Sequence, residues 1–296
     1  MSLVSRYLDP PLLERLQSLT LTARRVVEGA TTGPHRSPMR GASVEFRQHR
    51  AYVAGDEPRR LDWRVLARTD RPYVREYDEE TNLRCTILLD RSGSMAYRGA
   101  KRIRKFDYAA RIAASLAYLM LGQTESVGLA TFDTKMEAWV PPHSSGGQLA
   151  RIIDVLERTS PAGQSNPAAA MIEAAGRIGR RSLVVTLSDL FTDPAELRRA
   201  LACLRHGHHE VISLRVLDDD EVKFPFEHWL RIRGLEGEGS RLCEPAILRK
   251  RYVAAFEQHS DALDEAHRAV GVELYTFQTG RDLGDSLMGF LRRRHG

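Results

Sequence analysis

The sequence has few cysteines and no long apolar run. Its 296 residues include three cysteines, at the widely spaced positions Cys85, Cys203 and Cys243. This odd number and spacing exclude a CxxC pair and a zinc-binding pattern, and they argue against a disulfide-stapled scaffold. The most apolar stretches, residues 112–121 and 183–190, are far shorter than the roughly 20 residues needed to span a bilayer. We therefore expect a cytoplasmic protein in a reducing compartment.

The charge balance is moderately basic. Lys and Arg number 44 against 39 Asp and Glu, and the formal net charge is +5. This balance suits an acidic partner, such as a carboxylate-rich protein surface, nucleic acid or anionic lipid. It is equally consistent with a solvated, arginine-rich surface. The composition, with 42% hydrophobic and 28% charged residues, is typical of a globular protein with a substantial core.

The pattern of the chain changes at Leu83. Before it, residues 10–28 have helical spacing, residues 29–41 read as a loop, and residues 43–82 are charged with interspersed aromatics, which favours short strands and turns. After it, strand and helix patterns alternate, as in a parallel sheet covered by helices on both faces. We therefore predict an N-terminal helix plus a β-rich segment over residues 1–82. Residues 83–296 are predicted to form a doubly wound, Rossmann-like α/β domain with a mainly parallel sheet.

The predicted elements of this domain follow from hydrophobic periodicity. Strands are predicted at residues 83–89, 126–132, 136–140, 182–187, 210–216 and 272–277, with an edge strand at 229–233. Helices are predicted at residues 106–121, 147–158, 167–178, 194–205, 245–270 and 283–294.

One strand end carries a short polar motif, Asp90-Arg91-Ser92-Gly93-Ser94, directly after the apolar run Cys85 to Leu89. In open α/β sheets, ligands bind outside the carboxyl ends of the strands. The motif offers a carboxylate and two hydroxyls there, with no nucleophile and base pair. It therefore points to cation binding rather than to catalysis.

Two further segments bring oxygen donors to the same predicted edge. Ser165 lies in the loop before Pro167, and Asp189 follows the strand at residues 182–187. Carboxylate and hydroxyl oxygens suit Mg²⁺ or another divalent cation such as Ca²⁺ or Mn²⁺, with water in the remaining positions. Two carboxylates leave such a site under-neutralised, so a partner's carboxylate is expected to complete the shell. The predicted metal ligands are Asp90, Ser92, Ser94, Ser165 and Asp189.

These residues resemble the metal-ion-dependent adhesion site (MIDAS) of von Willebrand factor A domains. That site has Asp-x-Ser-x-Ser on one loop, Thr on a second and Asp on a third. Asp90, Ser92 and Ser94 match the first element, and Asp189 matches the third. Ser165 stands at the Thr position, where it keeps the hydroxyl and lacks the methyl group that restrains χ1. The resemblance implies a von Willebrand factor A-like fold and metal-dependent protein–protein interaction.

The segment before the domain is similar to the signature of a bacterial family, the domain of unknown function numbered fifty-eight. Members commonly stand in operons with MoxR-type AAA+ ATPases. The resemblance implies an adaptor, chaperone or assembly factor whose partner is such an ATPase or its client. The matching residues are Gly41, Ala42, Ser43, Val44, Glu45, Phe46, Arg50, Tyr52, Gly55, Asp56, Arg59, Asp62, Trp63, Ala67, Arg68 and Glu76.

Two other classes of function remain open. A magnesium-dependent phosphohydrolase would use Asp90 as the nucleophile, although such an enzyme normally has a second carboxylate where Ser92 stands. A basic nucleic-acid binder ranks last, because the chain has no recognisable nucleic-acid motif. We expect a binding protein rather than an enzyme, without contact with a membrane.

Two charged segments beside the predicted site admit simple interpretations. Residues 101–105, Lys-Arg-Ile-Arg-Lys, are either a positive segment that attracts an acidic partner or a solvated loop. Residues 218–221, Asp-Asp-Asp-Glu, are predicted to be an exposed acidic turn.

Overall fold

The computed structural model describes residues 7–16, 44–52, 62–69, 71–79, 83–100 and 102–295. The chain divides into one unit formed by residues 1–31 and 83–296 and a second formed by residues 32–82. The sequence grouped residues 1–82 together, whereas the N-terminal helix belongs to the unit that contains the large sheet. Beyond residue 16, the predicted helix at 10–28 and the loop at 29–41 lie outside the described residues.

The larger unit is built on a six-stranded sheet with the order β10-β7-β6-β3-β4-β5. All neighbouring strands are parallel except β4 and β5, which are antiparallel. This doubly wound order confirms the predicted α/β fold with a mainly parallel sheet. Its switch point lies between β3 and β6, where such folds bind ligands. The strands are β3 (Arg84–Asp90), β4 (Ser126–Phe132), β5 (Met136–His143), β6 (Leu183–Ser188), β7 (Glu210–Leu217) and β10 (Glu273–Gln278).

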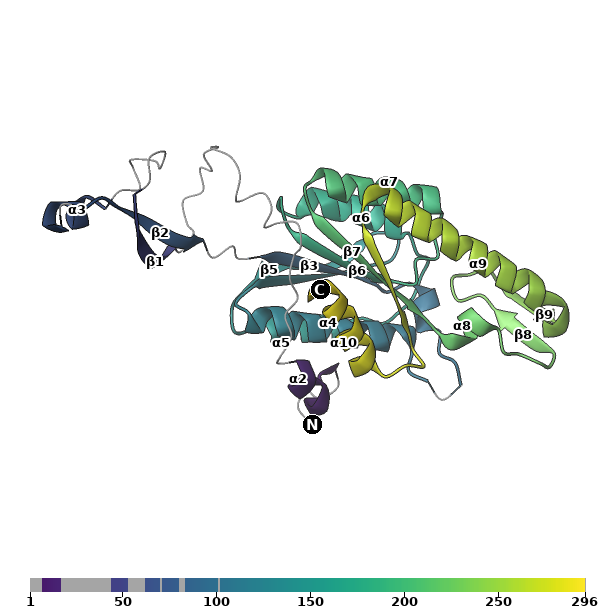
Figure 1. Cartoon of the computed structure of the whole chain (residues 1–296). Helices are drawn as coiled ribbons and strands as arrows, with labels where there is room; N and C mark the ends of the chain where they lie inside the picture. Colours follow the sequence, from purple (N-terminus) through teal and green to yellow (C-terminus); the bar gives the residue numbers. More distant parts are fainter. Residues whose placement is uncertain are drawn as a thin grey trace. The chain divides into compact units, whose positions relative to one another are not determined.

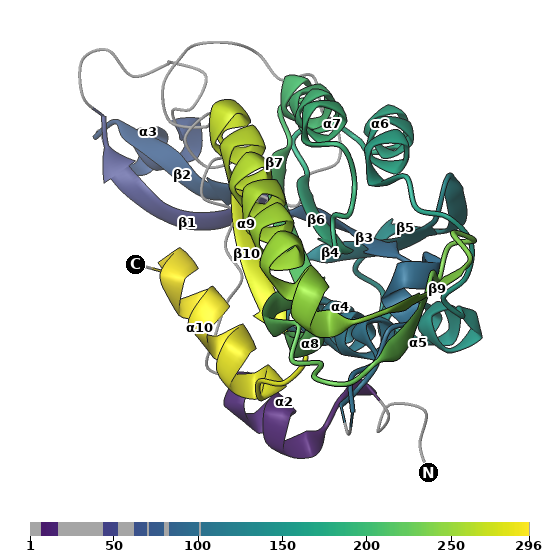
Figure 2. The same cartoon turned by 90° about the vertical axis from the view of Figure 1, so that its right-hand side faces the viewer.

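Helices cover both faces of this sheet (Figures 1 and 2). Successive strand side chains point to opposite faces, so Ile87 and Leu89 enter one hydrophobic core and Leu88 the other. The first core also contains side chains of α2 (Pro10–Leu16), α4 (Lys105–Gly122), α5 (Gln148–Arg158) and α10 (Leu283–His295). The second contains side chains of α6 (Pro167–Arg177), α7 (Pro194–His206) and α9 (Pro245–Val270).

Local signals define where the helices around the switch point begin. Asn166 accepts the amide of Ala169 at the start of α6, and Asp193 accepts two amides at the start of α7. Each cap is followed by a proline at the first helical position, which is pre-organised for a helix. These caps define where the loop between α5 and α6 and the loop after β6 end, and both loops contribute to the predicted site.

Helix α2 packs against the larger unit. Tyr7, Leu8 and Leu12 are buried in the first core, and the Tyr7 hydroxyl donates to the Leu156 carbonyl at 3.3 Å. Arg15 forms an ion pair with Asp285 at 2.6 Å. Burial of apolar side chains therefore explains why this helix belongs to the unit of the sheet.

The smaller unit contains two strands and a short helix. Strand β1 (Val44–Ala51) pairs antiparallel with β2 (Tyr73–Glu79), with a register shift between Phe46 and Gln48. Between them lies α3 (Trp63–Thr69), where Asp62 Oδ1 accepts the amide of Val65 at 3.3 Å. Residues 53–61, which hold part of the family signature, lie outside the described residues.

The segment between β7 and α9 differs from the prediction. Residues Leu230–Arg233 form β8, which pairs only with β9 (Ser240–Cys243) in a separate antiparallel hairpin. The edge strand predicted at residues 229–233 is therefore observed as a strand, and it belongs to a two-stranded hairpin because a glycine-rich turn at residues 234–239 returns the chain onto β8. The predicted exposed acidic turn is wrong: Asp218 is buried and caps the short helix α8 (Asp219–Lys223). None of the described helices is long and apolar enough to cross a membrane.

Candidate metal site

Asp90 links the loops at the carboxyl edge of the sheet. It ends β3 and is fully buried. Its Oδ1 accepts the backbone amide of Ser92 at 2.8 Å. Its Oδ2 accepts two hydroxyls, from Ser188 at 2.6 Å and from Ser165 at 3.1 Å. Through these hydrogen bonds, the Asp90 carboxylate connects three segments: the loop after β3, the loop before α6 and the end of β6.

The remaining predicted ligands join the same network. The hydroxyl oxygens of Ser92 and Ser94 lie 3.1 Å apart. Hydrogen bonding by the Ser94 side chain is one of the effects that lower the pKa of Asp189. The structure therefore brings together all five residues predicted from the sequence, although they come from three separate loops.

Backbone hydrogen bonds hold the loop after β3 against the loop before α6. The amide of Gly93 donates to the carbonyl of Gly163 at 2.8 Å, and the amide of Ala162 donates to the carbonyl of Arg91 at 2.8 Å. Gly93 begins the short 3₁₀ helix η2 (Gly93–Ala96). A Cβ atom at this position would lie 2.1 Å from the carbonyl oxygen of Leu235 and 3.0 Å from that of Gly163. Glycine is therefore required here by the close approach of two other backbone segments.

Lys105 is a participant that the sequence did not predict. Its side chain is fully buried, and its ammonium donates to Asp189 Oδ2 at 2.8 Å and to Glu221 Oε1 at 2.7 Å. Both interpretations of the basic segment 101–105 are therefore wrong for this residue. Lys105 is the first residue of α4, which starts beside the sheet edge, so its side chain reaches the site rather than solvent.

Arg102 is also paired within the chain. It forms ion pairs with Asp218 and Asp220, and the Asp218 carboxylate also accepts the amide of Gly99 and the hydroxyl of Thr279. The acidic segment thus serves to fix the loop that follows the Asp-x-Ser-x-Ser motif. The burial of Asp218 is possible because each of these donors compensates its charge.

The two carboxylates of the site have opposite pKa shifts. Burial, together with the negative charge of Asp189, raises the pKa of Asp90 from 3.8 to about 7. Burial also acts to raise the pKa of Asp189, but the Lys105 ammonium outweighs it and the pKa is lowered from 3.8. Asp189 is therefore ionised and already paired, whereas Asp90 is the carboxylate that a bound cation would stabilise in its charged form.

The donor set fits a small divalent cation. Carboxylate and hydroxyl oxygens are the kind of ligand that Mg²⁺ prefers, and the residues of this network would supply them. The pair Ser92 Oγ and Ser94 Oγ and the pair Ser165 Oγ and Asp90 Oδ2 are both separated by 3.1 Å. Within the described part of the chain, no group of three or more His, Cys, Asp or Glu is placed to hold a metal. Binding at this site would accordingly depend on hydroxyl ligands.

Glu236 is a second residue that the sequence did not predict. It lies in the turn of the β8–β9 hairpin, and its carboxylate accepts the amide of Ser94 at 3.2 Å and the amide of Ser165 at 3.0 Å. An acidic side chain from a distant segment therefore contacts both loops that supply hydroxyls. The available sequence signal was the alternation of Gly and Glu over residues 234–239 between two short apolar and basic runs.

The fold and this site define a doubly wound α/β protein with an oxygen-donor site at its switch point. The chain belongs to the family described as protein of unknown function DUF58, whose model matches residues 48–262. It is 30% identical over 295 residues to an uncharacterized protein of Mycobacterium bovis and to one of Mycobacterium tuberculosis, with 97% of this chain and 92% of each relative covered. The family expectation from the sequence is confirmed.

Several solved structures resemble the chain at low identity. An aerotolerance-related membrane protein from Bacteroides fragilis is 19% identical, with a TM-score of 0.48, and the match covers 72% of this chain and 98% of that one. The conserved hypothetical protein BatB from Bacteroides thetaiotaomicron is 16% identical, with a TM-score of 0.45 and the same coverage. The SpRpn10 VWA domain is 14% identical, with a TM-score of 0.41, over 70% of this chain and 95% of that one.

Proposed function

We propose that this protein is a metal-dependent protein–protein interaction module. The observation that carries the proposal is the single hydrogen-bonded network that joins Asp90, Ser92, Ser94, Ser165 and Asp189 at the switch point. These residues would hold Mg²⁺, or another divalent cation such as Ca²⁺ or Mn²⁺. When bound, the cation would act as a Lewis acid that accepts an oxygen ligand from another protein.

The charge arrangement supports this role. Lys105 compensates Asp189 from the buried side, so Asp90 is the main carboxylate left for the cation. A site of this kind remains short of negative ligands, and the side chain of a partner's Asp or Glu supplies one more. The hydroxyls of Ser92, Ser94 and Ser165 would bind the ion as neutral ligands and would leave most of its positive charge uncompensated. Binding to the partner would therefore require both the ion and an acidic residue.

The family context suggests the kind of partner. The resemblance stated from the sequence implies a MoxR-type AAA+ ATPase or one of its clients. An adaptor or assembly factor needs an interaction surface and no reaction of its own, in keeping with a site composed of ligands. We therefore propose an acidic segment of such an ATPase, or of its client, as the partner.

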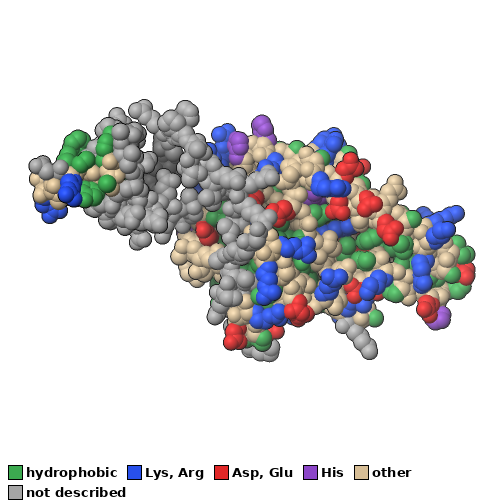
Figure 3. Space-filling model, viewed as in Figure 1, with side chains coloured by type: hydrophobic (Ala, Val, Ile, Leu, Met, Phe, Trp, Pro, Cys, Tyr) green, Lys and Arg blue, Asp and Glu red, His purple; other side chains and the backbone are tan. Residues whose placement is uncertain are grey.

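The phosphohydrolase alternative finds little support in the geometry. The position two residues after Asp90, where such an enzyme normally has a second carboxylate, is Ser92, whose hydroxyl lies 3.1 Å from that of Ser94. The nucleic-acid alternative is not favoured by the surface either. On the face shown in Figure 3, Lys and Arg are interspersed with Asp and Glu over the larger unit, rather than gathered in one stripe.

The test is a comparison of Asp90→Asn with Asp193→Asn in the full chain. Asp193 caps α7 outside the network, and Asn caps helices equally well, so this variant controls for the loss of one carboxylate. Calorimetric titration with Mg²⁺ and Mn²⁺, and capture of cell partners with and without EDTA, are the measurements. We expect Asp193→Asn to behave like the wild type and Asp90→Asn to lose both metal binding and EDTA-sensitive capture. Equal metal binding by all three proteins would refute the proposal.

A further inference from the structure

The β8–β9 hairpin brings its own carboxylate to the candidate site. The two oxygens of Glu236 accept the amides of Ser94 and Ser165, the residues whose hydroxyls are candidate ligands. We propose that Glu236 occupies, from within the chain, the position that a partner's carboxylate takes. An acidic partner segment then binds by displacing the turn at residues 234–239 and lying along the hairpin. This inference rests on the proposed function. It adds that Glu236 occupies the site in the absence of a partner and that the partner displaces it.

Three features of the β8–β9 hairpin favour its displacement from the site. Its two strands are four residues each and, among the strands that the structure describes, pair only with one another. An isolated two-stranded hairpin is marginally stable in water. Gly237 and Gly239 in the turn have φ values of +103° and +83°, which glycine adopts at little cost. The turn contacts the metal-site loops through the two amide hydrogen bonds of Glu236 and through the close approach of the Leu235 carbonyl to Gly93.

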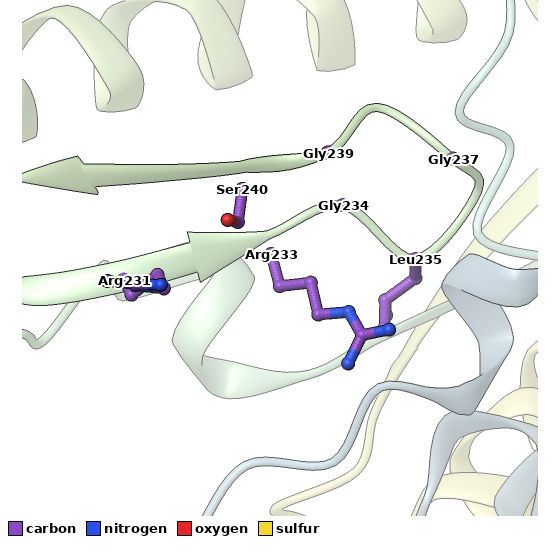
Figure 4. Close-up of a pocket in the computed structure, with 7 residues that line it drawn as sticks. All are labelled: Arg231, Arg233, Gly234, Leu235, Gly237, Gly239 and Ser240. Carbon is purple, nitrogen blue, oxygen red and sulfur yellow. The ribbon is translucent and has the colours of Figure 1, made fainter.

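The outer face of the hairpin has the chemistry of a surface for an acidic segment. Arg231 pairs with Leu242 in the ladder, and Arg233 pairs with Ser240, so these side chains share one face. Together with Leu235 and the turn glycines, Arg231, Arg233 and Ser240 line an open hollow of about 710 Å³ (Figure 4). The side chains of Leu235 and Leu242 are 45% and 63% exposed. Two arginines between exposed leucines suit a partner segment in which carboxylates alternate with apolar residues.

Because Glu236 and a partner's carboxylate compete for one position, the substitution Glu236→Gln should have opposite effects on two affinities. It should lower the affinity for the metal alone and raise the affinity for an external carboxylate. In Glu236→Gln the turn no longer offers a charged ligand, so affinity for the metal alone falls on the order of tenfold. The same change removes a tethered competitor whose effective concentration is on the order of millimolar. Affinity for an external carboxylate at the metal-loaded site therefore rises, on the order of tenfold, within the usual range of coupling between two ligands.

The experiment uses a probe with a single carboxylate side chain. The capped peptide acetyl-Gly-Leu-Glu-Gly-amide reproduces residues 234–237, and acetyl-Gly-Leu-Gln-Gly-amide is its neutral match. Saturation-transfer NMR reports peptide binding to the full chain, with Mg²⁺ and with EDTA. The proteins are the wild type, Glu236→Gln and Glu238→Gln. Glu238 lies in the same turn, and its carboxylate accepts the amide of Glu236 at 3.0 Å, so its substitution controls for turn charge.

We expect the Glu peptide to bind Glu236→Gln more tightly than it binds the wild type or Glu238→Gln, and only with Mg²⁺. The Gln peptide should show no such difference. If wild type and Glu236→Gln bind the metal alone and the Glu peptide with equal affinities, the inference is refuted while the proposed function stands. If no protein binds Mg²⁺ in the same titrations, the proposed function itself fails. Circular dichroism verifies that each variant is folded.

Discussion

Lys105 Nζ lies 2.8 Å from Asp189 Oδ2, and both side chains are buried at the carboxyl edge of the sheet. The same ammonium donates to Glu221, so one cation serves two carboxylates. Burial would lower the pKa of Lys105, but the two carboxylates outweigh that effect and raise it. The amine therefore stays charged throughout the physiological range. Lys105 is therefore a permanent counter-ion of Asp189, next to a site where we expect an exchangeable divalent cation.

Lys105→Met should strongly destabilise the protein, because it removes the cation that pairs with the buried Asp189 and the partly buried Glu221. Breaking one partner of a buried ion pair typically costs about 3–5 kcal/mol. The matched change Lys135→Met removes a lysine that is 73% exposed in a pair at 3.5 Å, and exposed pairs contribute about 1 kcal/mol or less. Urea unfolding of both variants in EDTA measures the difference. Equal free energies of unfolding would show that Lys105 is not a required counter-ion.

Asp90 should make the metal-free protein less stable as the pH rises from about 4 to about 7. The pKa of Asp90 is raised from 3.8 to about 7, so over this interval the folded state keeps a proton that the unfolded state has released. The contribution is fully present below the unfolded value and is lost as pH rises through the folded one, with a slope of at most about 1.4 kcal/mol per pH unit. Asp189, whose pKa is lowered, loses its contribution only at pH values below 3.8.

The measurement of this effect is the free energy of unfolding in EDTA at several pH values. Asp90→Asn cannot titrate, so its stability should fall less steeply with pH than that of the wild type. Asp193→Asn should follow the wild type. Parallel curves for wild type and Asp90→Asn would contradict the pKa assigned to Asp90.

Ser165→Ala should weaken metal binding, whereas Ser165→Thr should retain it. Alanine removes the hydroxyl that donates to Asp90 Oδ2, and we expect metal affinity to fall on the order of tenfold, equivalent to about 1.4 kcal/mol. Threonine keeps the oxygen and restrains χ1. Ser144→Ala, at an exposed position, is the control. Calorimetric titration with Mn²⁺ measures the metal affinity of Ser165→Ala, Ser165→Thr and Ser144→Ala. An unchanged affinity in Ser165→Ala would show that Ser165 is not a metal ligand.

Magnesium should raise the thermal stability of the wild type in a concentration-dependent way. A ligand that binds only the folded state at 100 times its Kd stabilises that state by about 2.7 kcal/mol. Asp90→Asn should show no such shift, and chelation with EDTA should reverse the shift in the wild type. Thermal unfolding followed by circular dichroism provides the test. An equal magnesium response in both proteins would place the cation elsewhere.

The features that could be predicted from the sequence are those encoded by adjacent residues or by the regular topology. The Asp-x-Ser-x-Ser motif is local, and its position after a buried strand follows from periodicity. Ser165 and Asp189 were found because parallel strands bring their carboxyl ends to one edge. Their proximity is observed, whereas their role as metal ligands stays a prediction.

Lys105 and Glu236 escaped prediction for different physical reasons. The charge of Lys105 suggests a solvent position, and only the packing of α4 beside two buried acids reverses that expectation. Glu236 belongs to a hairpin whose strands have four residues each, too short for periodicity to locate securely. Its contact with Ser165 spans 71 positions in sequence, and no local pattern encodes such a distance.

The close approach of Gly93 to the carbonyl of Leu235 makes the residue at position 93 and the turn at residues 234–239 sterically dependent on each other. The variable position between the two serines of the motif is free to change only if the hairpin turn changes with it. Relatives with a side chain at this position should therefore carry a shortened or redirected turn, and relatives with the same turn should keep glycine. The pair of positions, rather than the motif alone, should therefore distinguish relatives whose turn approaches the motif from relatives whose turn does not.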